Sequence, residues 1–237
     1  MEIIKGKHNK PWRLVVYGQP GIGKSSLAAS IPGALVLDTE DGTGLLECDR
    51  VHVTSYTQLV DALVELQQCH EYGTVVIDTA DAAELFIHKW ITDLEGGRPM
   101  AQCCGGYGKA YELSFNKWRN VLHLCDTLRE GGKNIGIVAH SRLERVEDPE
   151  QESYDRYTLN LQKLIPPLLF QWCDAMLFAM ASKVVVTGDD GKRKAKGQGE
   201  RLLRTCETPA CQAKNRYGMP PELPLKWEEV AKYLNNN

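Results

Sequence analysis

Eight consecutive residues near the N-terminus have the types and the spacing needed to hold a chain of phosphates. Residues 18–25 read GQPGIGKS and match the pattern G-x-x-x-x-G-K-[ST] at every defined position. Glycines in such a turn let successive backbone N–H groups point into one concavity and bind phosphate oxygens, while the lysine reaches the β- and γ-phosphates and the final hydroxyl is a ligand for Mg²⁺. The pattern therefore predicts a site for a nucleoside triphosphate and Mg²⁺. We expect its contacts to come from Gly18, Gln19, Pro20, Gly21, Ile22, Gly23, Lys24, Ser25 and Ser26.

The segments on either side of this glycine turn agree with that interpretation. Arg13–Tyr17 is a short apolar run typical of a buried strand, and Lys24–Ile31 has the pattern of a short helix that ends before Pro32. A strand before the turn and a helix after it are the context that a phosphate-binding loop requires, and the N-terminal end of the helix adds positive potential. A chance glycine turn would need neither element.

Two further carboxylates are candidates for the metal and for the attacking water. Asp78 ends the apolar run Thr74–Asp78, so we expect it to act as the carboxylate of the Mg²⁺ site. The alternative is a plain cap of the next helix. Glu40 follows the strand Ala34–Asp38 and could orient the water, but Asp38 and Asp41 compete for that role, and spacing alone does not choose among the three.

The order of the predicted elements indicates the fold class. Over the first 140 residues, apolar strands alternate with helices, among them one that Ser55 caps together with Gln58. Such alternation predicts an α/β fold with a mostly parallel sheet covered by helices. Later strands at 175–181, 183–187 and 201–206 predict antiparallel strands at one edge near the C-terminus. We expect the last two to pair as a hairpin around residues 188–199, and a closing helix over 225–234.

The P-loop, the segment Asp38-Thr39-Glu40 and the run TVVIDT together resemble the RecA-like P-loop ATPases. Within that family, the chain resembles the compact phage ATPases that act in single-strand annealing and recombination, the Sak group, over about residues 12–220. The resemblance implies one RecA-like ATPase domain over residues 1–237, with ATP and Mg²⁺ as cofactors. It also implies that Glu40 activates water and that Asp78 is the Walker B acid.

The resemblance assigns three more residues near the γ-phosphate. His140 follows the strand Asn134–Ala139, where the family places a γ-phosphate sensor that is usually Gln; a plain strand-end histidine is the alternative. Lys214 and Arg216 match the late K-N-K segment, whose cations reach the neighbouring subunit's γ-phosphate in a ring or filament. Cations spaced by one residue on a strand point the same way, although a solvated strand end would look identical.

Two segments are candidates for contact with single-stranded DNA. Residues 183–216 hold nine Lys or Arg and four Asp or Glu, a net charge of +5, whereas the whole chain carries −3. Phosphate contacts need clustered cations, and Lys192, Arg193, Lys194 and Lys196 lie together there. In the glycine-rich segment 95–108, Tyr107 could stack on an unpaired base beside Lys109; Tyr111 could do the same or belong to the core of the next helix. Residues 140–160 carry a net charge of −3, which is unsuited to DNA and departs from the family pattern.

Composition limits the remaining classes. A chain of 237 residues with 43% hydrophobic and 25% charged residues is globular. We expect no membrane span and no secretory signal. Eight cysteines without a CxxC pair favour free thiols and therefore a cytoplasmic location, in a bacterial host if the protein is phage-encoded.

The leading hypothesis is a DNA-stimulated ATPase that promotes annealing or strand exchange, with a single-strand DNA-binding protein as a possible partner. A helicase, a helicase loader and a P-loop kinase are alternatives, whereas the missing N/T-K-x-D motif disfavours a GTPase.

Overall fold

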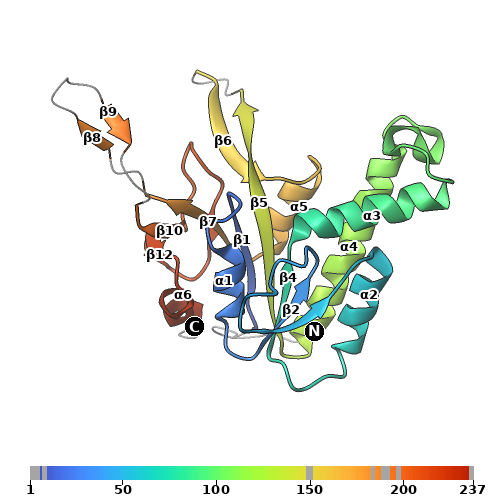
Figure 1. Cartoon of the computed structure of the whole chain (residues 1–237), viewed down its shortest axis with the longest axis horizontal. Coiled ribbons are helices and arrows are strands. Elements are labelled where there is room, and N and C mark those ends of the chain that lie inside the picture. The colour runs from blue at the N-terminus through green and yellow to red at the C-terminus, as the bar shows by residue number, and fades with distance from the viewer. Residues whose placement is uncertain are drawn as a thin grey trace.

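The structure is a computed structural model that describes residues 10–147, 152–182 and 199–234, with Gly6 and the backbone of 185–187 and 193–195. Its centre is a ten-stranded sheet in the order β12-β10-β7-β1-β5-β4-β2-β3, with β11 paired to β7 and β6 paired to β5 (Figure 1). The strands are β1 (Arg13–Gly18), β2 (Ala34–Asp38), β3 (Asp49–His52), β4 (Thr74–Asp78), β5 (Asn134–Val146), β6 (Tyr154–Leu159), β7 (Ala175–Ala181), β10 (Arg201–Arg204), β11 (Lys214–Asn215) and β12 (Glu222–Pro224). Separately, β8 (Val185–Thr187) pairs with β9 (Arg193–Ala195).

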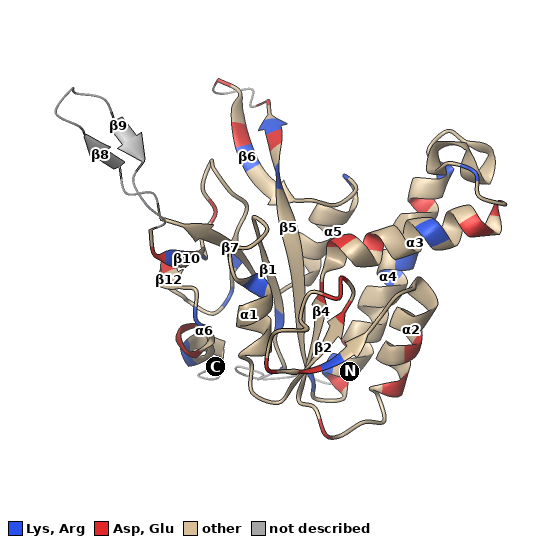
Figure 2. Ribbon diagram, viewed as in Figure 1, with Lys and Arg blue, Asp and Glu red and all other residues tan. Residues whose placement is uncertain are grey.

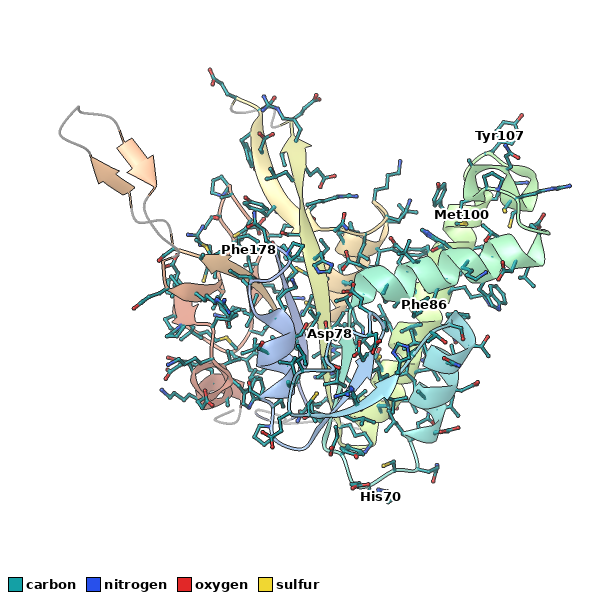
Figure 3. All side chains as sticks on the ribbon, in the orientation of Figure 1. His70, Asp78, Phe86, Met100, Tyr107 and Phe178 are labelled. Carbon is teal, nitrogen blue, oxygen red and sulfur yellow. The ribbon has the colours of Figure 1, made fainter. Side chains whose placement is uncertain are left out.

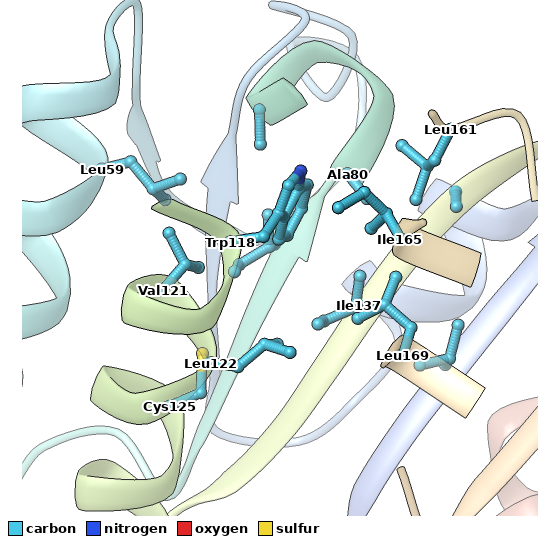
Figure 4. Packing of buried hydrophobic residues seen from close by; sticks show 14 of the residues in the cluster. Leu59, Ala80, Trp118, Val121, Leu122, Cys125, Ile137, Leu161, Ile165 and Leu169 are labelled. Carbon is cyan, nitrogen blue, oxygen red and sulfur yellow. The ribbon is translucent and has the colours of Figure 1, made fainter. Parts of the chain in front are cut away.

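Helices cover both faces of the sheet, as the sequence predicts. One face packs against α1 (Lys24–Ala29) and α6 (Trp227–Leu234). The other packs against α2 (Tyr56–Glu65), α3 (Ala80–Leu94), α4 (Lys109–Glu130) and α5 (Ile165–Trp172). Successive residues of β1 alternate between the two cores, because Val15 and Tyr17 face the second group while Leu14 and Val16 face the first. Trp118 of α4 is fully buried at the centre of the larger core (Figure 4).

The central strands are parallel, so their carboxyl ends meet at one edge of the sheet. In the register of β1, Gly18 lies opposite both His140 of β5 and Ala179 of β7. Asp38 at the end of β2 lies opposite Asp78 at the end of β4. The topology therefore brings the P-loop and the candidate acids to the same edge, where ligands bind in open α/β sheets.

Local signals set the ends of several elements. The hydroxyl of Ser55 accepts a hydrogen bond from the backbone N–H of Gln58 at 3.2 Å, and the Gln58 side chain accepts one from the N–H of Thr54 at 2.8 Å. This closes the start of α2 as predicted. Leu59 and Leu63 then lie on its buried face. The glycine-rich segment 95–108 is not wholly irregular, because Met100–Gly105 forms a short 3-10 helix.

Two predictions about the later strands need correction. The segment 201–206 does not form a hairpin with 183–187: β10 pairs antiparallel with β7 and with β12. This pairing covers the edge that β7 would otherwise expose and buries Leu203 completely. In addition, β5 continues past Ala139 to Val146 and forms a long hairpin with β6. The polar side chains there gave no periodic signal, but backbone pairing does not depend on one.

Two expectations concern bilayers and thiols. Among the described residues, no helix combines the length and the apolar character that crossing a lipid bilayer requires. All eight cysteines are free, and Cys103, Cys125, Cys173 and Cys211 are buried.

Candidate nucleotide site

The P-loop connects the end of β1 to the start of α1 beside an open cavity of about 410 Å³. Gly21 and Gly23 adopt positive φ angles of 74° and 108°, a region that favours glycine. Gly18 is needed for a different reason, because a Cβ atom there would lie 2.3 Å from the carbonyl oxygen of Ala179 in β7. The cavity is lined by Pro20, Gly21, Gly23, Lys24, Ser25, Ser26, Glu40, Gly42, Leu45, Leu46, Thr79, His140 and Arg201.

Lys24 is held inside the loop that it follows. Only 5% of the residue is exposed, and its Nζ donates hydrogen bonds to the carbonyl oxygens of Gly18 and Gln19, both at 3.0 Å. Burial lowers the pKa of this ammonium group, although the nearby carboxylates of Asp78, Asp81 and Glu40 oppose that effect. The charge is thus positioned at the phosphate cavity by the backbone of the loop itself.

Asp78 at the end of β4 is buried without a hydrogen-bond partner. It is 3% exposed, and neither carboxylate oxygen accepts a hydrogen bond of normal geometry among the described residues. Burial raises its pKa to about 6, with a smaller contribution from the charge of Glu40; Ser25 is near enough to lower the pKa but does not complete a hydrogen bond. Such a carboxylate beside a serine hydroxyl offers the hard oxygen donors that Mg²⁺ prefers. Figure 3 labels Asp78 at the centre of the fold.

The three acids after β2 have different surroundings. Asp38 is buried and accepts hydrogen bonds from the backbone N–H groups of Glu40, Gly42 and Thr43 and from the Thr43 hydroxyl. Burial alone would raise its pKa, but these hydrogen bonds outweigh it and lower the pKa. Asp38 therefore builds the turn, and Asp41 is exposed. Glu40 lines the cavity, with Oε1 accepting a 2.6 Å hydrogen bond from the Thr79 hydroxyl. This arrangement favours Glu40 as the group that orients water.

His140 lies beside Glu40 and lines the same cavity. Its Nδ1 is 3.8 Å from Glu40 Oε1 and 3.7 Å from Asp81 Oδ2. Its backbone N–H donates to Asp81 Oδ2 at 2.7 Å, and Asn160 donates to Asp81 Oδ1 at 3.0 Å. Asp81 thus ties α3 to the carboxyl end of β5 and to the segment after β6. Sequence reasoning missed Asp81, although an acid in the first turn of the helix after β4 was a visible signal.

Lys214 and Arg216 lie at the other end of the sheet from the P-loop of the same chain. Lys214 pairs with Met176 near the start of β7. Its Nζ donates to the carbonyl oxygens of Phe170, Gln171 and Cys173 at the end of α5, at 2.7, 3.3 and 2.7 Å. Arg216 pairs with Asp174 at 3.3 Å, but 58% of its side chain is exposed. Both cations therefore have partners within the chain, and only Arg216 is largely accessible.

The DNA candidates fall into three groups. Tyr107 is fully exposed and lies in Figure 3 at the outer tip beyond α3 and α4, next to the exposed Lys109. Tyr111 packs its edge against His88, with ring centroids 6.0 Å apart, so it belongs to the helix packing. Lys192 and Lys196 lie outside the described residues, and Arg193 and Lys194 are described only as backbone of β9.

The β5–β6 hairpin carries charges of both signs (Figure 2). Arg142 and Arg145 pair with Glu144 and Asp155, and Arg156 pairs with Glu207. Each arginine in the described part of the hairpin therefore has an acid partner within the chain.

A second cavity of about 370 Å³ lies on the other side of the P-loop, where Gln19 and Ile22 line it together with Tyr157 and Phe178. Its lining is mostly apolar, and the guanidinium of Arg204 at its rim is paired with Glu222 at 2.9 Å. The groups suited to phosphate chemistry gather in the first cavity instead.

A P-loop at the end of a central parallel strand, with a buried acid two strands away, defines an α/β P-loop ATPase. A protein-family model described as an AAA domain matches residues 10–217, so the chain belongs to this family. It is also similar to the light-independent protochlorophyllide reductase iron-sulfur ATP-binding proteins of Chlorobium phaeovibrioides, Chlorobium limicola and Chlorobium luteolum. Each is 37% identical over 106 residues, covering 40% of this chain and 35% of the relative. The chain thus spans about a third of the length of these ATP-binding relatives.

Proposed function

We propose that this protein is a RecA-like, Mg²⁺-dependent ATPase that binds single-stranded DNA and promotes annealing or strand exchange in recombination, as in the phage proteins it resembles. The observation that carries the proposal is that Lys24 and Glu40 line one cavity beside the P-loop, with the buried carboxylate of Asp78 close enough to both for their charges to interact. The DNA activity rests on the resemblance and on the exposed ring of Tyr107.

The hydrolytic step follows from what each side chain can do. The amide groups of the P-loop and Lys24 hold the phosphates, and Ser25 and Asp78 hold Mg²⁺, which when bound neutralises charge on the phosphoryl oxygens. Glu40 accepts a hydrogen bond from the attacking water and orients it toward the γ-phosphate. Thr79 fixes Glu40 through its hydroxyl, and His140 is placed to sense the phosphate from the end of β5.

Assembly would complete the site. We propose that the protein self-associates in a ring or filament and that Arg216, the more accessible of the two late cations, reaches the γ-phosphate of a neighbouring subunit. Single-stranded DNA is the proposed polymer partner, with a single-strand DNA-binding protein as a further one.

The first experiment is steady-state ATP hydrolysis with and without single-stranded DNA at two salt concentrations. We expect DNA to stimulate hydrolysis and salt to weaken the stimulation, because phosphate contacts release counterions. Tyr107→Ala should lose most of the stimulation while keeping basal hydrolysis, and Tyr107→Phe should keep both because the ring is retained. Hydrolysis that DNA never stimulates would refute the recombinase proposal, and hydrolysis only with a small phosphoryl acceptor would favour a kinase.

A further inference from the structure

Arg201 is a cation at the phosphate cavity that the P-loop pattern does not include. It begins β10, 177 positions after Lys24 in the sequence, and lines the same cavity as Lys24, Ser25 and Glu40. The pairing of β10 with β7 brings it there, because Arg201 lies opposite Ala181 just beyond the strand end that faces Gly18.

The guanidinium lies directly over the P-loop. A Cβ atom added at Gly23 would be 3.0 Å from Arg201 Nη1 and 3.2 Å from Leu225 Cδ2. Gly23 immediately precedes Lys24, the residue that reaches the β- and γ-phosphates in this loop type. The backbone of Arg201 is fixed independently of its side chain, because its carbonyl oxygen accepts a 2.9 Å hydrogen bond from the N–H of Leu225.

Arg201 also differs from the other arginines near this edge in having no acid partner. Arg204, on the same strand, pairs with Glu222, and Arg156 pairs with Glu207. Within the described parts of the chain, no carboxylate pairs with Arg201, whose residue is exposed to the cavity. An arginine fork that is positioned by its strand and left without a counterion is suited to bind phosphate oxygens in two parallel hydrogen bonds.

We propose that Arg201 binds the β- and γ-phosphates of ATP in the chain that carries it, as a second cation beside Lys24. This proposal rests on the proposed nucleotide site and adds a binding residue to it. If Arg201 binds the phosphates, a single chain can hold ATP without Lys214 or Arg216. ATP binding can then be measured separately from the association of subunits.

The test is ATP affinity measured by calorimetry with Mg²⁺. Arg201→Met keeps the aliphatic stem over Gly23 but removes the charge, and it should weaken ATP binding about tenfold, the effect of one charge-assisted contact. Arg201→Lys should recover part of that loss. Arg119→Met, which removes an exposed arginine of α4, is the matched control and should bind ATP like the wild type. Wild-type affinity in Arg201→Met would overturn the proposal.

Two further measurements separate the possible failures. If Lys24→Ala binds ATP normally, the P-loop site itself is wrong; if only Arg201→Met binds normally, the failure belongs to Arg201 alone. An equimolar mixture of Arg201→Met and Lys24→Ala should recover no tight binding when Arg201 acts within its own chain. Recovery in the mixture would show that Arg201 serves a neighbouring subunit and would refute the proposal as stated.

Discussion

Two buried carboxylates at opposite ends of the sheet have opposite surroundings. Asp174, just before β7, accepts hydrogen bonds from Arg13, Arg129 and Arg216 at 3.0–3.4 Å. Asp78, at the end of β4, accepts none of normal geometry among the described residues, and burial raises its pKa to about 6. Both residues are at most 6% exposed.

The different surroundings of the two carboxylates suit different roles, with Asp174 stabilising the fold and Asp78 available to a ligand. A buried charge is tolerated when partners within the chain compensate its lost hydration, and the guanidinium groups around Asp174 do so. Asp78 has Lys24 and the Ser25 hydroxyl nearby but accepts no hydrogen bond of normal geometry among the described residues, so burial disfavours its ionised form. Ligand binding thus belongs to the end of the sheet where the chain leaves a charge uncompensated.

The largest expected effect is on catalysis at Asp78. Asp78→Asn should lower ATP turnover about a thousandfold or more, because the Mg²⁺ site loses its only charged ligand in the proposed set. The same variant should be more stable than the wild type in metal-free buffer at pH 8, by up to about 3 kcal/mol, because a disfavoured buried charge is removed. Turnover assays and urea unfolding measure the two effects. A stable variant that hydrolyses ATP at the wild-type rate would end the metal assignment.

The converse is expected at Asp174. Asp174→Asn should destabilise the protein by about 3–5 kcal/mol, because it takes the carboxylate partner from the largely buried guanidinium of Arg129 and leaves that of Arg13 with Asp126 alone. Its turnover at low temperature should stay within about twofold of the wild type, because Asp174 lies far from the P-loop in the sheet. Urea unfolding gives the stability, and a large loss of turnover in the folded variant would contradict this division between the ends.

The pH dependence of stability sharpens the comparison. The pKa of Asp78 is raised from 3.8 to about 6 in the folded state. Below pH 3.8 the group is protonated in both states; between pH 3.8 and 6 the unfolded chain releases its proton first, so stability falls as pH rises, and above pH 6 the loss is constant. Without metal, the difference in unfolding free energy between Asp78→Asn and the wild type should grow from pH 4 to 6 by about 2 kcal/mol. A flat difference would contradict the raised pKa.

The smallest effect is expected at Lys214. Lys214→Met removes a cation that caps the last carbonyl groups of α5 and should lower stability by about 1 kcal/mol with unchanged turnover.

Arg216→Ala is the matched variant. It should leave ATP binding by the monomer nearly intact but lose turnover, because Arg216 is proposed to serve a neighbouring subunit. Wild-type turnover in Arg216→Ala would contradict the proposed role of Arg216 between subunits.

Local patterns predict the positions that depend on neighbours in sequence. The P-loop, the strands that end at Asp38 and Asp78, and the cap at Ser55 all depend on residues a few positions apart, and the structure has these elements. The pairing of β10 with β7 joins residues at least 20 positions apart, and the approach of Arg201 to Gly23 joins residues more than a hundred positions apart. A pattern of neighbouring residues holds no information about such contacts. The β5–β6 hairpin could not be predicted either, because its polar residues do not alternate with apolar ones.

The place of β1 in the sheet has a consequence for how the chain matures. β1 is made before both of its neighbours, because β5 and β7 lie more than a hundred residues later in the chain. The strand that ends in the P-loop has two open edges until β5 has left the ribosome and one open edge until β7 has, and closing such distant pairs is slow. A nascent chain should therefore acquire nucleotide affinity only after β7 has been made, which would make ATP binding a marker of correct folding across the whole sheet.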